Sequence, residues 1–233
     1  MTRLSNIFAV ARVACCLLGA AFYGCSLGPA ETTPVRTYLL DPNFAARTMS
    51  PKAVQSNHAT LLISLPKAQP GFETPRMAYL LRQHELSYYA FNQWVDTPGR
   101  MMLRLLAQAM EATGLWRAVV QAPSPIRADY RLDCDNLVLE QQFFSRGRVR
   151  LALRAQLVDI KRQSVMGVRN FEVFEDTLTD DAYGGVVAAN KASARLLDAL
   201  TDWVGAVMEE DRPAGQRSMS SKEGSLLDAL TRE

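Results

Sequence analysis

The sequence is poor in the residues that most enzyme sites use. Its 233 residues include two histidines, His58 and His84, and four cysteines. A catalytic triad or a histidine-based metal site would need one of these histidines, and both lie in polar segments that are typical of a protein surface. The HExxH, P-loop and GxGxxG motifs are also absent. We therefore expect a non-enzymatic protein with no catalytic residues, no metal site and no cofactor.

The chain also lacks an excess of charge of either sign. It has 26 Lys and Arg against 24 Asp and Glu, for a net charge of +2. Such a balance does not favour nucleic acid as a partner. Hydrophobic residues make up 48% of the chain, which is typical of a globular protein, and the length suits one domain or a tight pair.

The N-terminus has the pattern of a secretory signal peptide. Arg3 and Arg12 supply positive charge, and an apolar run follows over residues 13–23. The run is too short to span a membrane, which takes about 20 apolar residues, and it is typical of the hydrophobic region of a signal peptide. Gly24 and Cys25 come next, and a small residue before a cysteine resembles a bacterial lipobox.

We therefore predict a lipoprotein signal peptide over residues 1–24 and lipid attachment at Cys25, with fatty-acyl chains such as palmitate. Phe22 and Tyr23 depart from the lipobox pattern, so an ordinary cleaved signal peptide remains the alternative. The residue after the cysteine is Ser26. An Asp at this position would resemble a signal for retention at the inner membrane, whereas Ser resembles the pattern of lipoproteins sorted to the outer membrane. The predicted location is the periplasmic face of the outer membrane, with the membrane reached through the N-terminal lipid anchor.

The remainder divides into three segments. Residues 25–34 are small, polar and proline-containing, and we predict a tether there, whose nine residues after Cys25 span at most about 30 Å. Residues 35–210 form the predicted folded domain. Residues 211–233 are polar and small, which predicts a flexible tail. Cys134 would be the one thiol left after acylation, so no disulfide is expected.

The folded domain is predicted to be α+β. Its expected architecture is a two-layer antiparallel sheet with two amphipathic helices packed on one face. Pro98 at the start and Gly114 at the end mark the first helix, and the last helix is expected over residues 183–209. Gly184 and Gly185 are interpreted as a strand-to-helix turn. Strands are predicted over residues 35–41, 59–65, 76–82, 87–95, 116–120, 129–140, 148–160 and 164–178.

Charged residues alternate with apolar ones on the longest strands. Asp133 and Asp135 lie on one face of their strand, and Cys134 points to the other face, into the expected core. We interpret the two carboxylates as part of a cross-strand ladder with Arg148, Arg150 and Arg154. A glycosidase-like carboxylate pair is the enzymatic alternative.

Residues 76–95 are expected to form a hairpin with aromatic side chains on both faces. A sheet that is covered on one side would need only half of them. A second covering layer is therefore expected, which the same chain or a partner protein could supply. The candidate partner interface consists of Tyr79, Tyr89, Phe91 and Trp94.

These parts, in this order, resemble the ABC-type transport auxiliary lipoprotein family, the PqiC-like proteins. The resemblance rests on the lipobox cysteine, a Tyr-Leu-Leu strand at residues 38–40, a strand that ends at Pro66 and an aromatic segment before a Leu-rich helix at Pro98. It implies an outer-membrane accessory lipoprotein that docks the MCE-domain protein of an ABC lipid transporter. Lipid transport between the membranes is the implied process.

Two other functions remain open. One is an outer-membrane assembly or envelope-stability lipoprotein with a different protein partner. The other is an enzyme, for which His84 and Asp133 are the residues to test. The surplus of apolar strand surface also makes a homo-oligomer possible.

Overall fold

The computed structural model describes residues 33–42, 57–144 and 146–211. Eight strands and two helices follow one another in the order β1–β4, α2, β5–β8, α3. The predicted signal peptide, most of the tether and the tail beyond residue 211 lie outside the described residues, so their boundaries stay predictions. Neither described helix is long and apolar enough to cross a membrane. The bounds of the elements are β1 Arg36–Tyr38, β2 Asn57–Ile63, β3 Arg76–Leu80, β4 Leu86–Trp94, α2 Pro98–Ala112, β5 Trp116–Gln121, β6 Tyr130–Gln142, β7 Arg148–Asp159, β8 Ser164–Asp176 and α3 Ala182–Glu210.

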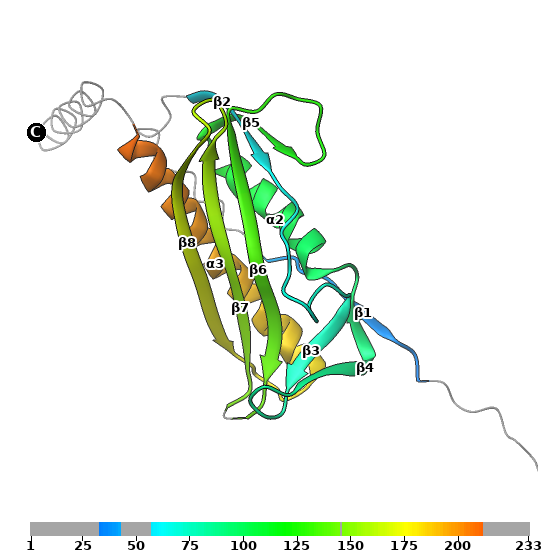
Figure 1. Ribbon diagram of the computed structural model, residues 1–233. Coiled ribbons are helices and arrows are strands. Elements are labelled where there is room, and N and C mark those ends of the chain that lie inside the picture. Colours follow the sequence, from blue (N-terminus) through cyan, green and yellow to red (C-terminus); the bar gives the residue numbers. More distant parts are fainter. Residues whose placement is uncertain (1–32, 43–56, 145, 212–233) are drawn as a thin grey trace, which may run out of the picture. The chain divides into compact units, whose positions relative to one another are not determined.

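The strands form a single mixed sheet, with both helices packed on one face (Figure 1). β6, β7 and β8 pair antiparallel through short turns, as predicted. The expectation of a wholly antiparallel sheet was wrong, because β2 runs parallel to both β5 and β6, β3 runs parallel to β6, and β1 runs parallel to β4. The α+β class is confirmed. Parallel neighbours need crossover connections, and α2 provides one of them between the hairpin and β5.

β6 organises the sheet because its two halves pair with different strands. On the edge away from β7, its first residues pair with β2 and its last residues with β3. A one-residue bulge separates the halves between Asp135 and Val138, with Asn136 in the left-handed region at φ 54°. A bulge of this kind shifts the alternation of side chains by one position. This explains why the sequence of β6 alternates cleanly only before Asn136.

The core lies between the sheet and the two helices. α2 contributes fully buried Leu105 and Leu106, α3 contributes Leu196 and Leu200, and β7 places every second residue against them. Burial of such side chains is the dominant favourable contribution to folding. The apolar stripes that the sequence predicted on both helices are therefore confirmed as the core faces.

The helix ends agree only in part with the sequence signals. Gly114 has φ 68°, the left-handed conformation expected after a helix. Thr97 occupies the N-cap position of α2, but its side chain makes no capping hydrogen bond. At α3 the N-cap is Asp181, whose Oδ1 accepts from the Gly184 N–H at 2.7 Å.

Gly184 and Gly185 lie inside the first turn of α3, so their interpretation as a strand-to-helix turn is corrected. A Cβ on Gly184 would lie 2.1 Å from the Thr179 carbonyl oxygen, and one on Gly185 would lie 2.3 Å from the Gln141 side chain. These glycines let the start of α3 approach the loop before it and β6 closely.

Candidate functional site

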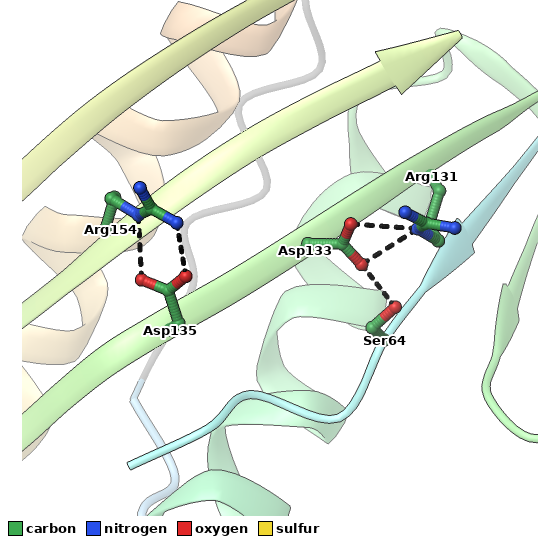
Figure 2. Close-up of polar contacts among 5 residues, drawn as sticks. All are labelled: Ser64, Arg131, Asp133, Asp135 and Arg154. Carbon is green, nitrogen blue, oxygen red and sulfur yellow. Dashed lines mark hydrogen bonds and ion pairs between the residues drawn. The ribbon is translucent and has the colours of Figure 1, made fainter. Parts of the chain in front are cut away.

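The face of β6, β7 and β8 that points away from the helices carries paired charges, and we call it the outer polar face. Arg154 on β7 holds Asp135 on β6 with two hydrogen bonds, Nε to Oδ1 at 2.9 Å and Nη2 to Oδ2 at 2.6 Å (Figure 2). This bidentate geometry is the strongest arrangement of an Arg–carboxylate pair. The hydrogen bond to Asp135 and the charge of Asp135 raise the pKa of Arg154 above its usual value.

Asp133 is held differently, by its own strand and by the segment after β2. The Arg131 Nε lies 3.0 and 2.9 Å from its two carboxylate oxygens, and the Ser64 Oγ donates to Oδ1 at 2.6 Å (Figure 2). Each carboxylate thus has donors that neutralise or solvate it. Arg131 and Asp133 remain 42% and 31% exposed at the side chain, so this pair faces water.

The expected ladder between the two aspartates and three arginines is correct for one pair only. The register places Asp135 opposite Arg154, whereas Asp133 lies opposite Gln156. Arg150 lies opposite Glu140, which it contacts at 3.5 Å, and its Nε donates to Glu172 of β8 at 2.7 Å. The bulge in β6 brings Glu140 rather than Leu139 opposite Arg150, so this arginine pairs with a carboxylate that the expected ladder did not include.

Arg148, the first residue of β7, is the third arginine of the outer polar face on this strand. Its Nε donates to Gln142 at 3.0 Å, and its guanidinium lies 4.3 Å from the centre of the Phe174 ring. Sequence reasoning missed the roles of Glu140, Gln142 and Glu172. The positions of Glu140 and Gln142 opposite the arginines depend on the bulge, whereas Glu172 lies on β8, whose register with β7 is separate.

The four predicted interface residues do not lie on one surface. Trp94 is 3% exposed and packs in the main core, with Met77 and the residues of α3 near a pocket of ≈ 10 Å³. A space of that size holds about one water molecule. The structure therefore assigns Trp94 to folding, because α3 supplies the covering layer on its side.

Tyr79 and Tyr89 are half-buried near the turn end of the hairpin. Their ring centres lie 4.8 Å apart, and the Tyr89 hydroxyl donates to Gln141 at 3.0 Å. Burial raises the pKa of Tyr89 to about 12, with smaller contributions from Tyr79 and from the carboxylates of Asp181 and Asp180. Phe91, in contrast, is 49% exposed. Of the four residues, only Phe91 has a largely uncovered side chain.

No metal or thiol chemistry is evident in the part of the chain that the structure describes. Within residues 33–42, 57–144 and 146–211, no group of three or more His, Cys, Asp or Glu side chains could hold a metal ion. Cys134 is buried at 3% exposure, as predicted, and burial raises the pKa of its thiol to about 12. A thiol of this kind is a poor nucleophile at neutral pH.

The sequence matches one family model over most of the folded domain. Residues 38–201 match the model described as ABC-type transport auxiliary lipoprotein component. The matched range begins at the last residue of β1 and ends inside α3, so it includes every element between them. No relative was found among curated proteins.

Two solved structures show the same fold. A Xanthomonas campestris protein described by the family model DUF330 superposes with a TM-score of 0.62 at 23% identity, over 75% of this chain and 98% of that one. A second crystal structure, of an uncharacterized protein, gives a TM-score of 0.56 at 12% identity, over 73% of this chain and 99% of that one. At these identities the likeness shows the fold alone.

Proposed function

Because the chain belongs to the family of ABC-type transport auxiliary lipoprotein components, we propose that it is an outer-membrane-anchored accessory lipoprotein of an Mce-type lipid transport system. In this function it docks the periplasmic MCE-domain protein, so that lipid passes between the two membranes. The observation that carries the proposal is the family match over residues 38–201. The family is one of transport components rather than of enzymes.

The anchor in this proposal is Cys25. A small residue precedes it at the end of an apolar run, and Ser26 rather than Asp follows it. Two or more acyl chains give firm attachment, since each buried methylene contributes about 0.8 kcal/mol. The tail from residue 211 has no role in the proposal.

The docking surface that we propose is the outer polar face. Tyr79, Tyr89 and Trp94 are occupied with packing and hydrogen bonds inside the chain, whereas the charged strands present side chains that a partner can reach. Its arginines and carboxylates alternate in sign, and such patterns contribute specificity and orientation to protein–protein contacts. A homo-oligomer that presents several copies of this face to one MCE assembly is compatible with the proposal.

Co-purification from gentle detergent tests the partner. We expect the MCE-domain protein to be recovered with the wild-type lipoprotein. Recovery of the lipoprotein alone, or of an outer-membrane assembly machine in its place, would count against the proposal. Cys25→Ala should leave an unprocessed precursor without fatty-acid label, and persistent label on this variant would move the anchor elsewhere.

A charge exchange tests the docking surface without leaving a charge unpaired. The double variant Asp135→Arg/Arg154→Asp keeps an ion pair between β6 and β7 but reverses its direction. We expect it to fold as the wild type does and to recover at least tenfold less MCE-domain protein. The matched control is Asp202→Arg on the exposed side of α3, which should recover the wild-type amount. Equal recovery by both would exclude the outer polar face as the docking surface.

A further inference from the structure

Four apolar side chains lie uncovered at the end of the sheet where the described chain begins. They are Val35, Leu39, Phe91 and Val95, with exposed fractions of 53%, 50%, 49% and 60%. We call them the β1–β4 apolar patch. Single exposed apolar residues are ordinary on a protein surface, but a group of four on and beside two paired strands is not.

The pairing of β1 with β4 brings these residues near one another, because all four flank the paired segment. The two strands are parallel, with Arg36 beside Asn92 and Tyr38 beside Trp94. Tyr38 and Trp94 point toward the helices, because Trp94 lies in the core and the Tyr38 ring lies 6.3 Å from that of Tyr183 on α3.

Side chains alternate over the paired residues, so Thr37 and Gln93 point away from the helices. Thr37 and Gln93 occupy the middle of this side and are joined by a hydrogen bond of 3.4 Å. Val35 and Phe91 lie before them and Leu39 and Val95 after them. The patch is thus apolar at both ends, with a polar pair between.

The chain covers apolar residues elsewhere on the same side of the sheet. Phe72, in the loop before β3, packs with Ala78 and Val138 in a small cluster that Tyr88 also contacts. Tyr88 is fixed there by a hydrogen bond of 2.8 Å from its hydroxyl to the Gly71 carbonyl oxygen. Among the described residues, none provides a similar cover for the β1–β4 apolar patch, whose members stay about half exposed or more.

The position of the patch in the chain indicates what covers it. Val35 belongs to the patch, and only nine residues separate it from Cys25. Nine residues reach at most about 30 Å. An acyl anchor on Cys25 therefore keeps this end of the domain near the bilayer, and Phe, Leu and Val side chains are the types that enter the boundary between headgroups and acyl chains.

We propose that the β1–β4 apolar patch lies on the surface of the lipid bilayer and forms a second membrane contact beside the acyl anchor. The proposal rests on the membrane anchoring proposed above. It adds an orientation to that anchoring, because two contacts restrict the domain's rotation, whereas an acyl anchor on a tether does not.

Labelling of the anchored protein tests this contact. The acylated chain is purified in detergent and reconstituted into vesicles of phosphatidylethanolamine and phosphatidylglycerol. Phe91→Cys receives an environment-sensitive nitrobenzoxadiazole label, and Val168→Cys on β8, where Val168 is 51% exposed on the same side of the sheet, is the matched control. Cys134 stays unlabelled because it is buried.

We expect brominated lipid to quench the label at residue 91 at least threefold more than the label at residue 168. Aqueous iodide should quench them in the opposite order. Equal quenching of both labels by iodide would overturn the proposal, since residue 91 would then face water. Protection from iodide without quenching by brominated lipid would also overturn it, because a protein such as a second copy would be the cover.

Flotation separates this inference from the anchoring on which it rests. The double variant Phe91→Ser/Val95→Ser should still float with the vesicles through Cys25, while its Leu39→Cys label loses its quenching by brominated lipid. A wild-type chain that does not float would remove the anchoring and this contact together. A chain that floats with residue 91 open to iodide would remove only the contact.

Discussion

The outer side of the sheet has two regions with opposite chemistry. On β6, β7 and β8 it carries charges that are paired within the chain, such as Asp135 with Arg154 at 2.6 Å. At β1 and β4 and the residues that flank them it carries apolar side chains, such as Phe91 and Val95, that are about half exposed or more. Paired charges are stable in water, whereas grouped apolar side chains gain free energy when another surface covers them. The comparison separates a surface suited to water and polar partners from one suited to a lipid or apolar cover.

β4 shows the same contrast within one strand. Trp94 is 3% exposed, whereas Phe91, three residues earlier, is 49% exposed. Both are large aromatic side chains with similar hydrophobicity. The difference arises from the side of the strand on which each lies, because the helices cover only one side.

Truncation of these two aromatics should give the largest contrast in stability. Trp94→Ala is expected to cost about 3–5 kcal/mol of unfolding free energy, because it leaves a cavity in the core. Phe91→Ala is expected to cost less than about 1 kcal/mol, since its side chain is already half in water. Denaturant unfolding of both variants measures the difference. Equal losses would show that Phe91 is part of the core.

Truncation of leucines on the buried faces of α2 and α3 should give the next largest losses of stability. Leu105→Ala on α2 and Leu197→Ala on α3 should each cost about 2–5 kcal/mol, because both side chains are at most 1% exposed. Asp198→Ala, on the exposed side of α3, is the control and should change the denaturant midpoint little. An unchanged midpoint for either leucine variant would show that the helix does not pack on the sheet as described.

The hydroxyl of Tyr89 should make the stability of the protein sensitive to alkali. Burial raises its pKa from 10.0 to about 12, so the folded state holds this proton after the unfolded state has released it. The stabilisation is complete below about pH 10 and is lost as the pH rises through about 12. Unfolding free energies at pH 9 and pH 11 should therefore fall more for the wild type than for Tyr89→Phe. The same fall in both would indicate an exposed hydroxyl.

Loss of one outer charge pair should have the smallest effect on stability. Arg154 and Asp135 are 41% and 33% exposed at the side chain, and ion pairs that face water contribute little to stability. A double-mutant cycle with Asp135→Asn and Arg154→Gln measures the coupling. A coupling as large as that of a buried ion pair would mean that the outer polar face is buried against another surface under the conditions of the measurement.

Much of the fold could be predicted from local patterns. The strict alternation over Arg148–Asp159 predicted β7 and its buried face, and the leucine repeats with Pro98 and Gly114 predicted α2 and its ends. These signals are local, because they depend on the period of a helix or strand and on residues that start or stop one. The buried position of Cys134 follows from the same alternation.

The pairing of the strands could not be predicted in this way. The parallel contacts of β2 with β5 and β6 join segments that are about 60–70 residues apart, and no short-range pattern encodes them. The charge ladder was predicted only in part for a related reason. The bulge at Asn136 displaces the register by one residue, and a shift of one residue changes which side chains face each other.

The sequence by itself determined the helices, the long strands and the family, because hydrophobic period, turn residues and an ordered set of motifs are all properties of the chain. It also carries the signal on which the anchor at Cys25 is proposed. Only the tertiary structure decided which aromatic side chains are available to another surface. Aromatic residues on both sides of β4 are equivalent in sequence, and the packing of α3 against one side buries Trp94 while the other side leaves Phe91 exposed.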